Sequence, residues 1–146
     1  MANERVLALA PDLTRRAPRS ARSPLGRYGA IAARALDKCR AEIAGRAGPY
    51  QYNCPLDREF FKFTKIDAAE FKTFVGTGAS DDEVADWVAS KSRVRDSKQI
   101  SLWNLWFRVN PINLLLDFDD WLYGRRCGSM VQRRDEQKAN KLKLRT

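Results

Sequence analysis

Residues 28–46 read YGAIAARALDKCRAEIAGR, and this stretch decides the fold class. Its apolar residues recur at steps of three and four, which places them on one face of an α-helix. These residues are Tyr28, Ile31, Ala32, Ala35, Leu36, Cys39 and Ile43. Because Gly45 or Gly48 ends the pattern, the stretch predicts a long amphipathic helix over residues 28–46.

The segments that flank this helix predict one extended arm and a second helix. Residues 11–27 hold three prolines and one glycine, which favours an ordered, extended arm. Pro55 suits the first position of a helix, so residues 55–63 are expected to be helical.

Two further helices are indicated by their start signals. Asp67 with Glu70, and Ser80 with Glu83, have the spacing of a capping box, in which each side chain binds the backbone of the other. We expect a short helix to begin directly after Asp67 and another directly after Ser80.

The last two predicted helices follow a linker. Ser97 can cap a helix that runs to Val109, and Asn110–Pro111 restarts a helix that runs to about Tyr123. The helix that carries Trp103 and Trp106 is apolar nearly all round, so it is expected at the centre of the fold.

About six helices with short connections predict an all-α fold. We expect a single compact domain over residues 1–124 and a basic, flexible tail over residues 125–146. The tail carries eight basic and two acidic groups, and so supplies +6 of the formal net charge of +9. Such a tail either binds nucleic acid or acidic proteins non-specifically, or is simply a solvated end.

Several classes of site are excluded by composition. There is no histidine, and the cysteines at 39, 54 and 127 form no CxxC pair. This excludes zinc sites built from Cys and His, and nucleophiles activated by histidine. No glycine-rich phosphate loop or dinucleotide motif is present, so no cofactor and no metal are predicted. Whether the chain is an enzyme stays open.

The compartment is predicted from the cysteines and from hydropathy. Scattered, unpaired thiols are typical of a reducing cytoplasm. No apolar run approaches the roughly 20 residues that a membrane helix needs. We therefore expect a cytoplasmic protein with no membrane partner.

Cys54 is the first candidate catalytic residue. It precedes Pro55 at a predicted helix start, where the helix dipole favours a thiolate. Without histidine, its base would have to be Asp57, Lys38, a tyrosine or water. The alternative interpretation is a small packed residue, because free cysteines are commonly buried.

The polar edge of the long helix is the second candidate. Arg34 and Lys38 lie on a basic stripe beside the apolar face, and Asp37 lies farther round the helix. Together with Arg19 from the arm, this stripe could hold a carboxylate or phosphate. An ion-paired helix face explains the same residues equally simply.

Aromatic residues and one amide form the third candidate. Tyr50 and Trp103 could line a pocket, although aromatic residues at helical spacing are commonly part of a core. Asn104 is a polar residue on an apolar helix, so it must hydrogen-bond either a ligand or the arm.

These segments together resemble a small bacterial family, the domain of unknown function 5069. The resemblance covers roughly residues 12–110, and Lys65 and Cys39 depart from its usual residues. It implies that the arm belongs to the folded domain, and it brings no established activity. The matching segments are DLT (12–14), PRS (18–20), Leu25-Gly26, Tyr28, ARALDKCRAEIAG (33–45), Gly48, Tyr50, CPLDREFFKF (54–63), IDAAEF (66–71), SDDEVADWV (80–88) and Trp103-Asn104.

The leading hypothesis is a polar pocket that binds an anionic small molecule. One alternative is a module that binds nucleic acid or acidic proteins through its basic tail. A second is a protein-interaction domain with no small-molecule site. The predicted ligand-binding residues are Arg19, Arg34, Asp37, Lys38, Tyr50, Trp103 and Asn104, and the oligomeric state is left open.

Overall fold

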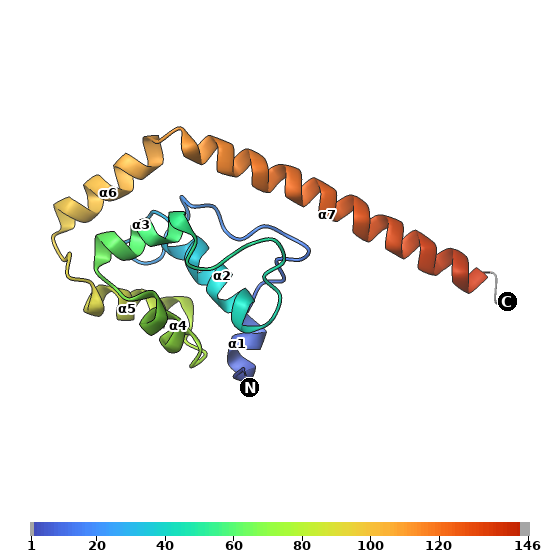
Figure 1. Ribbon diagram of the computed structural model, residues 1–146, viewed down its shortest axis with the longest axis horizontal. Helices are drawn as coiled ribbons and strands as arrows, with labels where there is room; N and C mark the ends of the chain where they lie inside the picture. The colour runs from blue at the N-terminus through green and yellow to red at the C-terminus, as the bar shows by residue number, and fades with distance from the viewer. Residues whose placement is uncertain (1, 144–146) are drawn as a thin grey trace.

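The computed structural model describes residues 2–143, with side chains up to Cys127 and at Gln137. The described part is all-α, which confirms the predicted fold class, and its only extended pairing is an isolated bridge between Leu25 and Tyr28. Its seven helices (Figure 1) are α1 (Glu4–Leu9), α2 (Ala32–Ile43), α3 (Pro55–Thr64), α4 (Ala68–Val75), α5 (Asp81–Lys91), α6 (Ser97–Val109) and α7 (Ile112–Lys143).

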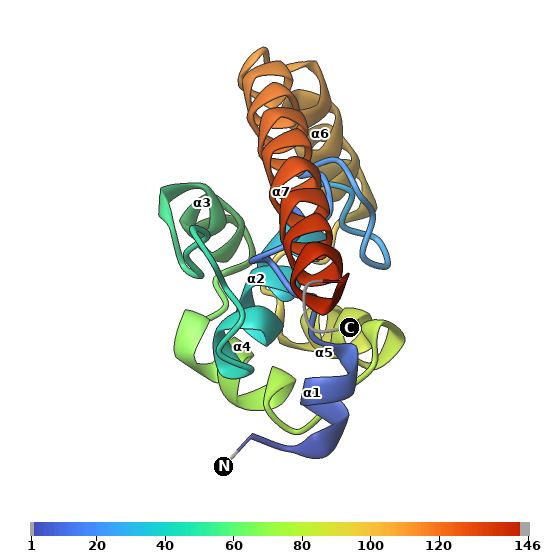
Figure 2. The ribbon, with the colours of Figure 1, turned by 90° about the vertical axis from the view of Figure 1, so that its right-hand side faces the viewer.

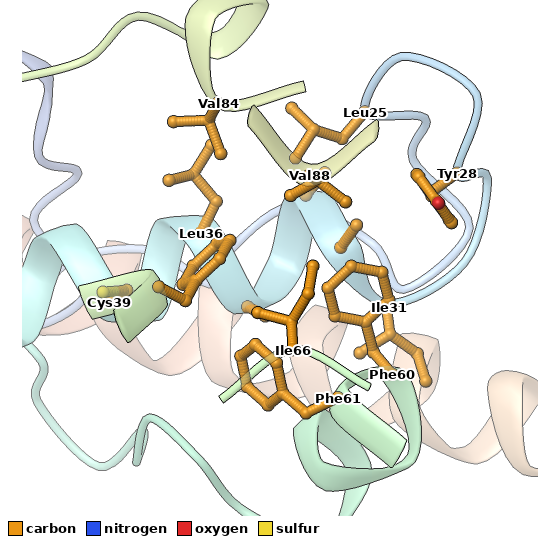
Figure 3. Close-up of a cluster of buried hydrophobic side chains, with 14 of the residues drawn as sticks. Leu25, Tyr28, Ile31, Leu36, Cys39, Phe60, Phe61, Ile66, Val84 and Val88 are labelled. Atoms are coloured by element: carbon orange, nitrogen blue, oxygen red, sulfur yellow. The ribbon is translucent and has the colours of Figure 1, made fainter. Parts of the chain in front are cut away.

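Helix α2 is the centre of the fold. Ten of its twelve residues are buried, and Ile31, Leu36 and Cys39 are fully enclosed. Figure 3 shows these side chains meeting apolar residues from α3 and α5, among them Phe60 and Val88. At about 1.5–3 kcal/mol for each large apolar side chain, this burial is the main stabilising contribution to the fold.

The central helix begins four residues later than predicted. Leu25 and Tyr28 exchange backbone hydrogen bonds, N to O, at 2.8 and 3.1 Å, which closes a turn before the helix. Ile31 then adopts a φ of +65°, a conformation that a β-branched residue rarely takes. Tyr28 and Ile31 still pack in the core, so the apolar pattern marked buried residues that precede the helix as well as those within it.

Helices α3, α4 and α5 begin at the predicted residues. Pro55 occupies the first turn of α3. Asp67 caps α4 by accepting from Ala69 N and Glu70 N. Ser80 and Glu83 form the reciprocal capping box at α5.

The N-terminal arm is ordered, as predicted, and it is folded through turns as well as extended pieces. Its Leu13 and Ala21 are buried. Leu13 N donates to Arg46 O at 2.9 Å, and Ile31 N donates to Ala21 O at 2.7 Å. The arm is therefore fastened to both ends of α2. Helix α1 precedes it and was not predicted.

Two predictions about the C-terminal helices are wrong. Helix α6 is peripheral, because its Leu102, Leu105, Trp106 and Val109 are all exposed. Helix α7 does not stop near Tyr123 but continues past Gly124 to Lys143. A glycine inside a helix costs only about 1 kcal/mol, so it does not by itself end one.

Helices α6 and α7 lie on one side of the body formed by α1–α5. Figures 1 and 2 both show this placement, with α7 reaching beyond the body. None of the described helices is long and apolar enough to cross a membrane. Residues 144–146 of the predicted flexible tail, and most of its side chains, lie outside the described residues.

Candidate functional site

Helix α2 buries four charged side chains together with its apolar ones. Arg34, Asp37, Lys38 and Arg40 are each between 3% and 5% exposed. A buried charge is costly unless a partner of opposite charge compensates for it. The four residues are distributed among three ionic clusters, each of which joins α2 to a different segment.

The thiol cluster consists of Lys38, Cys54 and Asp57, and it brings together all three candidate catalytic residues. Lys38 Nζ donates a hydrogen bond to Cys54 Sγ at 3.1 Å and lies 2.8 Å from Asp57 Oδ1. Asp57 is completely buried, and its other oxygen accepts from Asn53 N at 3.0 Å. The hypothesis that Asp57 or Lys38 serves as the base for Cys54 stays a prediction, but Lys38 contacts both other residues.

The arm cluster consists of Arg19, Asp37, Arg40 and Asp81. Asp37 accepts from Arg19 N at 2.8 Å and from Arg19 Nε at 3.1 Å. Asp81 lies between two arginines, with its Oδ2 2.8 Å from Arg19 Nη1 and its Oδ1 2.7 Å from Arg40 Nη1. The cluster therefore ties the arm and the start of α5 to α2.

The charges in the arm cluster shift one another's ionisation. Burial alone would raise the pKa of Asp81, but hydrogen bonds and positive charge from Arg40 and Arg19 outweigh it and lower the pKa. Burial likewise acts to lower the pKa of Arg19, and the two carboxylates reverse the direction and raise it. An open depression of about 480 Å³ lies beside the cluster, and its walls also include Leu9, Arg16, Ser80 and Asp82.

The anchor cluster consists of Arg34, Tyr50 and Asp120. Arg34 binds the Asp120 carboxylate with both terminal nitrogens, and its guanidinium lies 5.5 Å from the centre of the Tyr50 ring. The Tyr50 hydroxyl donates to Asp120 Oδ1 at 3.1 Å. Burial, and then the negative charge of Asp120, raise the pKa of Tyr50. This cluster attaches α7 to α2.

Trp103 and Asn104 belong to none of these clusters. Asn104 Oδ1 accepts from Gly29 N at 2.9 Å, and its Nδ2 donates to Arg27 O at 3.0 Å. Trp103 stacks on Phe63 with 4.5 Å between ring centres. Of the two partners expected for Asn104, a ligand or the arm, the fold supplies the end of the arm.

The structure thus distributes the predicted site residues over separate places instead of around one pocket. Sequence reasoning also missed Arg40, Asp81 and Asp120, whose partners lie 41 to 86 residues away. One signal for Asp120 was present, because Asn113, Asp117, Asp120 and Tyr123 form a polar stripe at helical spacing.

The polar stripe faces the body, and the apolar side of α7 faces outward. Asp117 pairs with Arg22, and Tyr123 donates to Leu13 O at 2.6 Å. On the opposite side, Leu114 and Leu115 are each 67% exposed. Of the hydrophobic residues of α7, Leu116 packs against the core and Cys127 is buried, whereas the larger part of its apolar side points away from the body.

Together, α6 and α7 expose what we call the apolar face. It comprises Leu102, Leu105, Trp106, Val109, Ile112, Leu114, Leu115, Phe118 and Trp121, which are 46–68% exposed. If each shows roughly half of the ~150–250 Å² of a large side chain, the face covers on the order of 900 Å². The largest apolar patch on a typical monomer is about 300–600 Å².

Comparison with known proteins gives one family. No curated protein matches the chain. The family model described as a domain of unknown function, DUF5069, matches residues 15–114. That span runs from the arm through α2 to the start of α7 and covers more than half of the chain; it contains the whole thiol and arm clusters but not Asp120 of the anchor cluster. The chain therefore belongs to the DUF5069 family.

Proposed function

We propose that this domain is a protein-interaction module that associates with a second copy of itself through the apolar face. The observation that carries the proposal is the outward placement of nine large apolar side chains on two consecutive helices. Exposed apolar area of this extent is unfavourable in water and is characteristic of interaction surfaces.

The area of the face fits a stable dimer. A standard protein interface buries about 800 Å² on each partner, and the face offers on the order of 900 Å² by the same rough measure. It also contains Trp106 and Trp121, and tryptophan is enriched among the residues that dominate binding energy.

The charges around the face favour a second copy as the partner. Arg108 is exposed on α6, and Asp119 is exposed on α7. In a two-fold symmetric dimer each surface meets its own copy, so a residue on α6 can lie opposite a residue on α7 of the other copy. In the dimer that we propose, α6 lies on α7 of the second copy and Arg108 faces Asp119, since opposite charges at a rim fix the register.

Binding of an anionic small molecule is a second candidate function, and fewer observations support it. The depression beside the arm cluster contains three arginines, and one of them, Arg16, is exposed. Against this, Arg19, Arg34, Lys38 and Arg40 each have a carboxylate of the chain as partner. A panel of small anions tests the candidate: a compound that binds there raises the melting temperature, and the Arg16→Ala variant loses that effect.

Binding of nucleic acid through the basic tail rests mostly on side chains that lie outside the described residues, since only Arg125 and Arg126 of its eight basic groups are described. It predicts an affinity that falls steeply with salt. Deletion of residues 125–146 tests this candidate: binding should disappear, and binding that is retained without the tail would rule the candidate out.

Light scattering on the full chain over a range of concentrations tests the dimer. We expect a mass of twice 16.7 kDa at micromolar concentration. Leu105→Glu and Leu115→Glu should each weaken the dimer at least about 100-fold, because each buries a charge at the centre of the interface. Glu59→Lys, an exposed change on α3, is the matched control and should leave the mass unchanged.

A charge exchange tests the proposed register. Arg108→Asp and Asp119→Arg should each weaken the dimer, and the double variant should recover most of the affinity. Weakening without recovery would mean that the two residues do not face each other.

A photo-crosslinking residue at position 105 distinguishes the two parts of the proposal: that the face binds a protein, and that this protein is a second copy of the chain. An adduct of two chains in expressing cells supports the full proposal. An adduct with another protein, formed at position 105 but not at position 59, supports a protein-interaction module and rejects a second copy as its partner. A monomeric protein that forms no adduct at position 105 rejects both parts of the proposal.

A further inference from the structure

The thiol cluster contains an amine in direct contact with a sulfur. Lys38 Nζ lies 3.1 Å from Cys54 Sγ, and its side chain is only 4% exposed. Burial restricts a lysine that would otherwise sample many rotamers, so the nitrogen is held beside the sulfur. Among the residues that the structure describes, neither Cys39 nor Cys127 has a lysine amine in hydrogen-bond contact.

Asp57 completes the arrangement as a proton acceptor. Its Oδ1 lies 2.8 Å from Lys38 Nζ as an ion pair, yet it accepts no hydrogen bond of good geometry from the described residues. The carboxylate is completely buried and is fixed through its other oxygen by Asn53 N. A proton that leaves Lys38 therefore has a receiving atom already in contact.

Cys54 is also the most exposed of the three cysteines. Its residue is partly exposed, whereas Cys39 and Cys127 are buried. It sits at the N-cap of α3 and makes no side-chain capping hydrogen bond there. Its sulfur is committed only to Lys38 among the described contacts.

We propose that Cys54 and Lys38 form an oxidative modification site, in which a small hydroperoxide triggers a covalent sulfur–nitrogen bond between the two side chains. This site is independent of the apolar face and of the dimer. Sulfenic acids condense with a neighbouring backbone nitrogen to give a sulfenamide, an amine is the stronger nucleophile, and two groups held in contact react far faster than free ones.

The chemistry proceeds in two balanced steps. The Cys54 sulfur attacks the terminal oxygen of the hydroperoxide, the O–O bond breaks, and an alcohol or water leaves. The sulfur, now a sulfenic acid, has lost two electrons to the peroxide. Lys38 passes a proton to Asp57, its nitrogen attacks the sulfur, and the S–O bond breaks to release water. One thiol, one amine and one hydroperoxide thus give a sulfenamide, one alcohol or water, and one further water.

The new bond would change the core in two ways. It removes the positive charge of Lys38 and leaves Asp57 protonated, so the buried ion pair becomes neutral. It also cross-links the middle of α2 to the start of α3, closing a loop of about 17 residues, which restricts the unfolded chain. We expect the melting temperature of the modified protein to rise by several degrees.

Intact mass measurement after treatment with one equivalent of hydrogen peroxide tests the site. The protein used is the full chain with Cys39→Ala and Cys127→Ala, because an internal disulfide would give the same mass change. We expect a loss of 2 Da, one peptide pair joining Lys38 to Cys54, and recovery of the original mass with dithiothreitol.

Lys38→Arg is the matched variant, since it retains a positive charge beside Asp57 and lacks the nucleophilic amine. It should gain 16 Da or more at Cys54 and never lose 2 Da. The proposal is overturned if the unsubstituted Lys38 protein shows only gains of 16, 32 or 48 Da at Cys54. A gain of 14 Da joining the same peptides would place oxygen between the atoms and would overturn the direct bond. Peptide mapping of the Lys38 protein decides the question even if the variant does not fold.

Discussion

Arg34 on α2 holds Asp120 on α7 through two parallel hydrogen bonds, Nη1 to Oδ2 at 2.6 Å and Nη2 to Oδ1 at 3.1 Å. The two residues are 86 positions apart in the chain. Their side chains are only 6% and 15% exposed. This pair is the most enclosed ionic contact between α7 and the rest of the described molecule.

Removing one member of this pair should destabilise the protein. Asp120→Asn leaves Arg34 charged and poorly compensated, which costs roughly 3 kcal/mol for a buried pair. Urea denaturation of the wild type and the variant measures the difference. Asp86→Asn, on the exposed side of α5, is the control and should change the free energy of unfolding by less than about 0.5 kcal/mol. Equal effects of the two substitutions would contradict the role of the pair.

The contribution of Asp81 to stability should depend on pH. Its folded-state pKa is below the ordinary value, because hydrogen bonds and charge from Arg40 and Arg19 outweigh burial. The stabilisation is therefore full above the ordinary pKa of about 4 and is lost as the pH falls through the folded value. The melting temperatures of wild type and Asp81→Asn should differ clearly at pH 6.5 and converge towards pH 3. With Asp82→Asn, an exposed neighbour, the difference should stay small at both pH values.

Gly48 should tolerate alanine much less well than Gly45. Both have a positive φ, of +57° and +69° respectively, so each substitution costs roughly 1–2 kcal/mol for the conformation. At Gly48, a Cβ would also lie 2.5 Å from Leu13 O, whereas nothing lies within 4 Å at Gly45. We expect Gly48→Ala to cost roughly 1–3 kcal/mol more than Gly45→Ala in chemical denaturation. Equal costs would show that the arm moves aside freely.

Cys54 should react with alkylating reagents before Cys39 and Cys127 do. Burial raises the pKa of Cys39 to about 12, and both Cys39 and Cys127 are buried. Iodoacetamide followed by peptide mapping should label Cys54 first, with the other two modified only on unfolding. Labelling of Cys39 at the rate of Cys54 would show that the core opens far more readily than its packing implies.

The local part of the fold was predictable from the sequence. Helix starts depend on residues three or four apart, so Ser80 and Glu83 gave the start of α5 correctly. Lys65 shows how far such local reasoning extends. It ends α3 with a φ of +61°, a conformation that glycine adopts freely and that no local signal at Lys65 predicts.

The long-range part was not predictable from one sequence. A polar stripe can be read on α7 from the sequence, but not which of its sides meets the body, and the prediction that α6 lies at the centre of the fold was wrong. Arg34 and Lys38 stood out in the sequence as charges beside an apolar face, and their partners Asp120 and Asp57 lie on other helices. Nothing in the local pattern pairs a charge with a partner so distant in the chain.

The two faces of α7 respond to dissolved salt in opposite directions. Its inner contacts, through Asp117 and Asp120, are ionic, and added salt weakens partly exposed ionic contacts. Its outer contacts are apolar, and salts such as sulfate strengthen apolar association. In the proposed dimer, dissolved salt therefore weakens the contacts that hold α7 on its own body and strengthens the association through its outer side. A concentrated sulfate solution should favour the dimer, whereas a dilute buffer should hold α7 more firmly on the body.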